Sequence, residues 1–353
     1  MFFKGNSIEQ FIDSRKNNLD IIRFFAATFV VFSHAYPLTT GNNSTEAFAV
    51  FSNGQMTFGE LAVSIFFVIS GFLITQSYDR SKDVIYYFKA RVLRIFPGLI
   101  FCVLLSVLIL GPIFTELSVL EYFKDYDTYE YLRTITLYWI QYDLPGVFHS
   151  NIWPDAINGS LWTLWYEFFF YIVVAVLGIM RLLDRRIVLI SFLLATALHY
   201  IGIGGFYTDL YRYFGAGMVF YLYRKQLKIN GWMAVLSFII LAVTVKYGYF
   251  IYAFSIFGTY FIFYLAFETR LRLHNFGKFG DFSYGIYIYG FPMQQIMAHT
   301  FGQLTPWQNF LLAYPLALIF AIASWYLVEK RALKYKKVSL LKFKQDYKPQ
   351  NTN

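Results

Sequence analysis

The stretch "NNLDIIRFFAATFVVFSHAYPL", residues 17–38, decides the class of fold. From Leu19 onward it is mainly apolar for about 20 residues, which is the length of a helix that crosses a lipid bilayer. Two ionisable side chains nevertheless lie within it, Arg23 near one end and His34 near the other. Ionisable groups inside a membrane span face protein or a water-filled cavity, so this helix predicts a buried functional site.

The composition of the whole chain supports an integral membrane protein. Of its 353 residues, 58% are hydrophobic, 22% are aromatic and only 14% are charged, and the mean hydropathy is +0.47. A soluble chain carries about 25% charged residues. We therefore predict an all-α, polytopic fold in which residues 1–337 form one membrane-embedded domain and 338–353 form a polar cytoplasmic tail.

Ten segments are long and apolar enough to be predicted as membrane spans. They are residues 19–38, 58–78, 95–113, 159–180, 187–203, 207–223, 231–247, 250–267, 282–299 and 307–328. The sixth contains Asp209 and Arg212, which lie one helical turn apart and can pair. Residues 131–142 are too short to span and predict an interfacial or re-entrant helix.

The positive charges give these spans an orientation. With the N-terminus inside and ten spans, 26 of the 30 Lys and Arg residues lie at the inner side, as the positive-inside rule requires. The outer loop 114–131 is acidic. Both termini are therefore predicted to be cytoplasmic. The net charge of +9 reflects topology and attraction to anionic lipids rather than nucleic-acid binding.

Arg23 and His34 lie on one face of the first helix. They are eleven residues apart, just over three turns, and thus about 16 Å apart along the axis. One interpretation is structural: Arg23 extends to lipid headgroups and His34 makes a single hydrogen bond. The other is a channel with an anion-binding inner mouth and a proton-handling outer site, for which an imidazole is well suited.

A carboxylate enters the fourth span from the outer side. The sequence "NGSLWTLWYEFFFYIV" (158–173) predicts a helix with Asn158 or Ser160 as its N-cap. Glu167 then lies about two turns deep, near the depth of His34. There it can fix the tautomer of His34 and stabilise the charged imidazole, or it can pair structurally with Arg212. The neighbouring aromatic residues are interfacial anchors or stacking surfaces for a sugar: Trp162, Trp165 and Tyr166.

A second group of basic residues follows the second span. In "YYFKARVLRIFPGL" (86–99), Arg91 and Arg94 lie one turn apart at the cytoplasmic surface, before Pro97 at the start of the third span. Both guanidinium groups can bind phosphate oxygens, although charges that only fix topology give the same pattern. In "SIFFVISGFLITQSY" (64–78), Ser70 and Gly71 predict close backbone approach of a slender group.

Together these segments resemble acyltransferase family 3, the integral-membrane O-acyltransferases that modify bacterial cell-surface glycans. The first helix "LDIIRFFAATFVVFSH" (19–34) is similar to the family's Arg-to-His signature. Three further matches are "FFVISGFLIT" (66–75), "RVLRIFP" (91–97) and "SLWTLWYEFFFY" (160–171). Weaker matches are "FGDFSYGIYIYGFP" (279–292) and "ASWYLVEKRAL" (323–333). The family often has a histidine where this chain has Gly290.

The resemblance implies transfer of an acyl group, usually acetyl, from cytoplasmic acyl-CoA to a hydroxyl of a cell-surface or exported glycan. The acceptor would lie on the outer side of a bacterial cytoplasmic membrane, and no metal or bound cofactor is expected. We expect the acyl-CoA-binding residues to be Arg23, Arg91, Arg94, Ser70 and Gly71. The expected catalytic residues are His34 and Glu167, and the expected acceptor-binding residues are Trp162, Tyr166 and Tyr284.

In the resulting hypothesis, His34 removes the proton of a sugar hydroxyl as this hydroxyl attacks the thioester. Glu167 orients His34, Tyr284 is a candidate oxyanion donor, and a covalent acyl group on His34 is an open alternative. Two other classes are a glycolipid transporter or flippase with a His34–Glu167 proton relay, and a glycan polymerase. The sequence has no visible inverted repeat and few outward-facing basic residues, which disfavours both.

Overall fold

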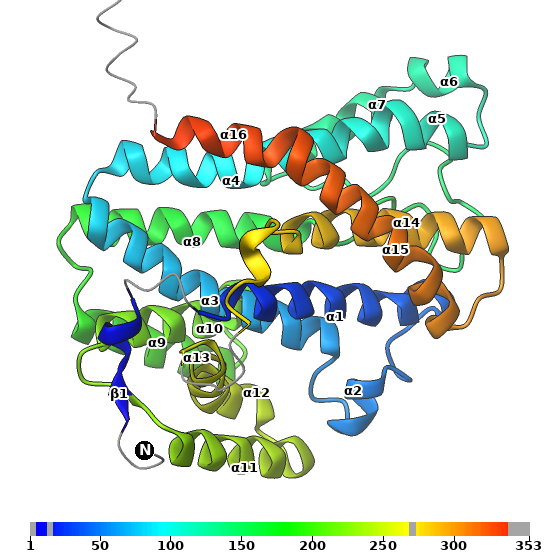
Figure 1. Ribbon diagram of the computed structural model, residues 1–353. Helices are drawn as coiled ribbons and strands as arrows, with labels where there is room; N and C mark the ends of the chain where they lie inside the picture. The colour runs from blue at the N-terminus through cyan, green and yellow to red at the C-terminus, as the bar shows by residue number, and fades with distance from the viewer. Residues whose placement is uncertain (1–4, 13–16, 268–272, 338–353) are drawn as a thin grey trace, which may run out of the picture.

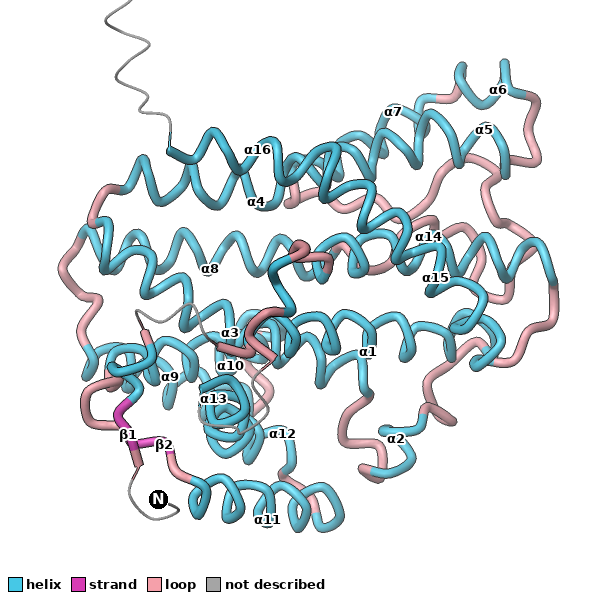
Figure 2. The backbone as a smooth tube through the Cα atoms, viewed as in Figure 1, coloured by secondary structure: helices cyan, strands magenta, loops and turns pink. Residues whose placement is uncertain are grey.

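The computed structural model describes residues 5–12, 17–267 and 273–337, and these are mostly helical (Figures 1 and 2). The strands of this part of the chain are β1 (Asn6–Ser7) and β2 (Lys228–Ile229), which pair antiparallel near the start of the chain. The predicted helical architecture is therefore confirmed. The predicted polar tail, 338–353, lies outside the described residues.

Within the described residues, six helices are long and apolar enough to cross a membrane. They are Leu19–Thr40 (α1), Phe58–Ser81 (α3), Val84–Phe114 (α4, a π-helix and α5), Trp162–Ile179 (α8), Phe250–Phe267 (α12, a π-helix and α13) and Pro306–Lys334 (α15, a π-helix and α16). Other helices are shorter or less apolar: α9 (Arg185–Tyr200), α10 (Gly205–Leu222), α11 (Gly231–Tyr247) and α14 (Ser283–Phe301). All ten predicted segments thus contain helix, and the membrane character of the chain is supported.

The helix that carries Arg91 and Arg94 begins earlier than predicted. α4 (Val84–Leu105) starts directly after Asp83, whose carboxylate accepts a hydrogen bond from the Tyr86 amide at 3.0 Å. Its first turns are held by Tyr87, a buried side chain whose hydroxyl donates to the Tyr171 carbonyl at 2.9 Å. The two arginines are therefore in a helix interior rather than in a cytoplasmic loop, and Pro97 lies within this helix rather than at its start.

The segment before α8 is not a membrane helix. It contains the short helices α6 (Val119–Lys124) and α7 (Tyr126–Glu130) and a 3-10 helix, Tyr131–Thr136, followed by irregular chain. The predicted N-cap of α8 was wrong, because the helix begins at Trp162 without a side-chain cap. The Asn158 side chain instead accepts from the Ser160 amide and donates to the Ile288 carbonyl at 2.8 Å. This contact fixes the irregular segment against α14.

Glycines bring α3 and α10 into direct backbone contact. A Cβ added at Gly71 would lie 1.9 Å from the Phe214 carbonyl oxygen, and one added at Gly217 would lie 2.1 Å from that of Val68. Small residues allow membrane helices to approach this closely. The slender group that Gly71 accommodates is therefore the backbone of α10. α1 and α8 pack against this pair, and α14 packs against α1. Figure 1 shows α1 crossing the middle of the molecule.

Candidate active site

Two neighbouring cavities lie between these helices. The arginine cavity, of about 240 Å³, contains Arg23, Arg91 and Arg94 in its lining. The histidine cavity, of about 330 Å³, contains His34 in its lining. Both cavities share Val63 of α3 and Tyr287 of α14 as lining residues. The cavity of the predicted anion site and that of the predicted proton-transfer site are therefore adjacent.

An aspartate holds two of the arginines together. The carboxylate of Asp281, which precedes α14, lies 2.5 Å from Arg94 and 3.0 Å from Arg23. Burial alone would raise the pKa of Asp281. The guanidinium groups of Arg23 and Arg94 and hydrogen bonds from Ser283 outweigh this effect and lower its pKa to about 2. The group is therefore ionised at neutral pH and reduces the repulsion between the two cations.

Arg91 differs from these two because its guanidinium group makes no ion pair with the described residues. Its buried Nε has no hydrogen-bond partner, and its guanidinium carbon lies 5.9 Å from the centre of the Tyr171 ring. Lys336, from the last turn of the described chain, also lines this cavity. Arg91 and Lys336 are thus the cations best placed to bind an added anion.

Lys336 and Asp281 were not singled out from the sequence. Lys336 is one of several basic residues near the C-terminus, and only the fold brings it to α4. Asp281 lies in the weak motif "FGDFSYG". The one sequence feature that hints at an ion pair of Asp281 with a cation is its place in a segment that was predicted to be cytoplasmic and basic.

Tyr284 lies in the arginine cavity rather than beside His34. Its hydroxyl donates to the Ile95 carbonyl at 2.8 Å, and its ring centre is 5.6 Å from the guanidinium carbon of Arg94. Arg94 also approaches Glu329, a buried carboxylate, at 3.6 Å. Tyr284 thus contacts α4, and its roles in acceptor binding and oxyanion stabilisation stay predictions.

Glu167 makes neither of the two contacts considered from the sequence. Its Oε1 accepts hydrogen bonds from Ser70 at 3.0 Å and from Tyr171 at 2.5 Å, and no bond to His34 or Arg212 occurs in the described chain. It lines the arginine cavity together with Ser70. The predicted depth was similar, but the side chain points to the other cavity.

His34 occupies a largely apolar corner of the histidine cavity. Its Nδ1 is buried and has no hydrogen-bond partner among the described residues, and its ring meets Phe291 edge to face at 5.4 Å. Trp162 lines the same cavity. Tyr166 does not line it, and instead packs on Trp162 with ring centres 5.8 Å apart. Among the described residues, none therefore engages the Nδ1 of His34 in a structural hydrogen bond.

The opposite wall of the histidine cavity carries a polar cluster. The predicted pairing of Asp209 with Arg212 is confirmed at 2.5 Å, and His199 lies 3.4 Å from the same carboxylate oxygen. Glu60 of α3 lines the cavity as well. Apart from the Asp209–Arg212 pair, no sequence pattern predicts this cluster, because its members come from three separate helices.

The chain is similar to known acyltransferases. The family model described as "Acyltransferase domain" matches residues 16–330. An O-acetyl transferase of Shigella phage Sf6 is 31% identical over 338 residues, which cover 90% of this chain and 96% of that protein. Nodulation protein 10 of Rhizobium leguminosarum bv. viciae is 34% identical over 167 residues, 46% of this chain and 44% of that protein. No solved structure gives a significant match. The chain therefore belongs to acyltransferase family 3, and it is a membrane-embedded O-acyltransferase.

Proposed function

We propose that the enzyme transfers an acetyl group from cytoplasmic acetyl-CoA to a hydroxyl of a cell-surface or exported glycan on the outer side of a bacterial cytoplasmic membrane. The observation that carries this proposal is the pair of adjoining cavities, one basic and one containing His34. Family membership favours acyl transfer over the transporter and polymerase alternatives.

The proposed topology has ten spans and cytoplasmic termini. In Figure 1 the connection from α3 to α4 and that from α8 to α9 lie at the left, together with β1. These connections carry basic residues: Arg80, Lys82, Arg181, Arg185 and Arg186. The acidic segment with α6 and α7 lies at the right. This separation of charge supports an arginine cavity open to the cytoplasm.

In the proposed donor complex, the phosphate groups of acetyl-CoA bind at the arginine cavity. Arg91 and Lys336 offer unengaged positive charge, and Arg23 and Arg94 add to it while they remain bound to Asp281. The pantetheine arm then passes Ser70 and Glu167, whose oxygens can bond its amide groups. The acetyl thioester ends near Val63 and Tyr287, at the wall shared with the histidine cavity.

His34 then acts as the general base. Its imidazole accepts the proton of the acceptor hydroxyl while the hydroxyl oxygen forms a bond to the thioester carbonyl carbon. The carbon–sulfur bond breaks, and the CoA thiolate takes up the proton that His34 accepted, which regenerates the neutral imidazole. General base catalysis contributes about 100- to 10,000-fold. Binding of both substrates at the wall shared by the two cavities also holds the hydroxyl close to the thioester, which lowers the barrier further.

The proposal is tested by the release of CoA from acetyl-CoA by the purified full-length protein, with and without glycan acceptors. We expect thiol release that depends on an acceptor and is matched by the amount of ester formed. A transporter would move substrate without releasing thiol. Tight binding of acetyl-CoA without acceptor-dependent thiol release, over a broad panel of glycans, would contradict the proposed reaction.

A further inference from the structure

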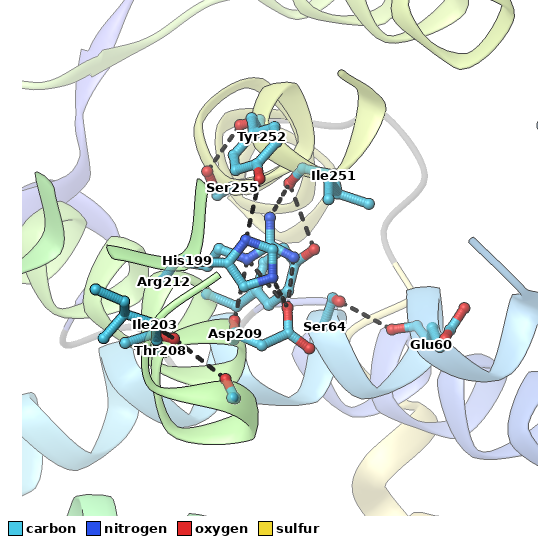
Figure 3. A network of polar contacts seen from close by, with 12 residues as sticks. Glu60, Ser64, His199, Ile203, Thr208, Asp209, Arg212, Ile251, Tyr252 and Ser255 are labelled. Carbon is cyan, nitrogen blue, oxygen red and sulfur yellow. Dashed lines mark hydrogen bonds and ion pairs between the residues drawn. The ribbon is translucent and has the colours of Figure 1, made fainter. Parts of the chain in front are cut away.

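The polar wall of the histidine cavity, shown in Figure 3, has features of a binding site rather than of helix packing. Arg212 of α10 is only 2% exposed, and its guanidinium group is bound by neighbouring protein groups. It donates to Asp209 at 2.5 Å and to the Ile251 carbonyl at 3.0 Å, and it stacks on Tyr213 at 4.5 Å. This buried group fixes the position of Asp209.

The contacts that Arg212 and His199 make with the Asp209 carboxylate fall on one of its oxygens. Arg212 and His199 both approach Oδ1, and His199 is itself held by Tyr252, whose hydroxyl lies 3.1 Å from Nδ1. Oδ2 makes no hydrogen bond or ion pair with the described residues, and the side chain is 32% exposed and lines the cavity. Asp209 is thus a rigid carboxylate with one oxygen left for a ligand.

Glu60 has the same arrangement on α3. Its Oε2 accepts from the Thr57 amide at 2.7 Å and from the Thr57 hydroxyl at 3.1 Å, in the capping box that begins this helix. Its Oε1 makes no hydrogen bond or ion pair with the described residues, and Glu60 also lines the cavity. Two carboxylates are therefore fixed through one oxygen each and present the other.

The charges of the cavity define what it can accept. Arg212 is the only Lys or Arg among its described lining residues, and its charge is already matched by Asp209. The carboxylate of Glu60 is left without a counter-ion there. The negative charge of Glu60 would repel a carboxylate of a ligand. Hydroxyl groups of a ligand can instead donate to the free oxygens of Asp209 and Glu60. Trp162 adds an aromatic face on which a sugar ring can stack.

We propose that Asp209 and Glu60 bind the acceptor, and that this acceptor is an uncharged, polyhydroxylated sugar rather than a uronic or sialic acid. His199 and Arg212 are positioning residues that hold Asp209. The unpartnered His34 lies in the same cavity, so a sugar bound there presents a hydroxyl to it. The inference rests on the proposed function for the identity of the transferred group, but not for binding of the sugar.

The first experiment measures sugar binding without any donor. Saturation-transfer NMR of the full-length protein in nanodiscs compares methyl glycosides of glucose, galactose and mannose with those of glucuronic and galacturonic acid. We expect transfer signals for neutral glycosides and none for the uronic acids. Asp209→Asn and Glu60→Gln should each weaken binding by about tenfold or more, as expected for a lost charge-assisted bond.

The variants are chosen to keep the fold. Gln at position 60 preserves the helix cap, and Asn at position 209 keeps an oxygen for Arg212. Glu130→Gln is the matched control, because Glu130 pairs with Arg133 at 2.6 Å outside both cavities and its variant should bind sugars normally. Thermal unfolding of each variant shows which proteins are folded.

The second experiment measures acetyl transfer to the glycosides that bind. We expect Glu60→Gln, Asp209→Asn and His199→Gln to raise the acceptor KM with a smaller change in kcat and an unchanged Kd for acetyl-CoA. If the folded variants lose sugar binding but the unmodified protein transfers no acetyl group, the proposed function is refuted and the acceptor site stands. Preference for uronic acids, or an unchanged acceptor KM in both carboxylate variants, would overturn the acceptor site.

Discussion

At the scale of single residues, the account depends on His34. The spacing of Arg23 and His34 predicted one polar face, and the structure places the two side chains in adjoining cavities. His34→Gln retains a hydrogen-bonding side chain but cannot take up a proton at neutral pH. We expect this variant and His34→Ala to bind acetyl-CoA normally and to lose at least about 100-fold in acceptor-dependent kcat.

That prediction is checked by titrating acetyl-CoA binding and by measuring turnover in the same preparations. Glu167→Gln is the comparison, because Glu167 contacts Ser70 and Tyr171 rather than His34. Its effect should be weaker than that of either His34 variant. Near-normal transfer by His34→Gln would show that the histidine belongs to a polar pathway and is not the base.

The dependence of the rate on pH should follow the same imidazole. A protonated His34 cannot accept another proton, so kcat/KM for the acceptor should fall as the pH decreases through its titration. Asp281 does not contribute in this range. Its pKa is lowered to about 2. The stabilising effect of the ionised Asp281 is therefore complete above the ordinary carboxyl pKa and is lost as the pH falls from there through about 2. A rate that rises on acidification would contradict the general-base role.

Arg91 and Arg94 should separate donor binding from stability. Arg91→Ala removes a cation without an ion pair and should weaken acetyl-CoA binding by about tenfold, with little change in the unfolding temperature. Arg91→Lys should recover only part of the affinity, since it replaces a planar fork by a point charge. Arg94→Ala leaves Asp281 and Glu329 without their cation and should cost about 3 kcal/mol of stability.

Calorimetric titration with acetyl-CoA and thermal unfolding, applied to the three variants in parallel, check this separation. Normal acetyl-CoA affinity of a folded Arg91→Ala protein would leave this arginine as a determinant of topology only.

Single residues could be predicted from the sequence where the prediction concerned two residues of the same helix. The common face of Arg23 and His34 follows from helical periodicity alone. The predicted contact of Glu167 with His34 is absent from the described residues, because depth in a membrane does not specify the direction in which a side chain points. Asp281 and Lys336 were missed because their partners lie on other helices, and only the packing brings them together.

At the scale of helices, the sequence predicted the elements better than their contacts. All ten predicted segments contain helix, because long apolar runs specify helical spans. α4 was predicted too short, since its charged first turns were placed before the third span, 95–113. They are helical because Tyr87 is buried against α8 and the arginines face a cavity. The irregular chain before α8 depends on contacts such as that of Asn158 with Ile288, which no local pattern predicts.

The contact between α3 and α10 gives a prediction at this scale. Gly71→Ala and Gly217→Ala should both prevent the helices from packing, because the added carbon meets backbone atoms that cannot move aside. Loss of the folded peak in size-exclusion chromatography, or a large drop in unfolding temperature, is the expected result. Gly215→Ala is the control on α10, since its nearest neighbour is a Tyr211 ring atom at 3.3 Å. Folded and stable Gly71→Ala protein would restore a role of this glycine in substrate approach.

At the scale of the whole molecule, the central claim is that donor and acceptor approach from opposite sides and meet at the wall of Val63 and Tyr287. This claim is tested in proteoliposomes that contain acetyl-CoA labelled in both the acetyl group and the CoA portion. A Cys102→Ala protein carrying Asp127→Cys allows the orientation to be determined with an impermeant thiol reagent, because Asp127 is exposed in the acidic segment that we propose to lie outside.

The decisive measurement is the distribution of the two labels when a glycan that the purified enzyme acetylates is present only outside. In vesicles with the arginine cavity facing the lumen, we predict that labelled acetyl ester appears outside while all labelled CoA remains inside. The same vesicles with His34→Gln should produce no ester. Appearance of the CoA label outside, or ester formation only when donor and acceptor share one compartment, would contradict transfer through the two adjoining cavities.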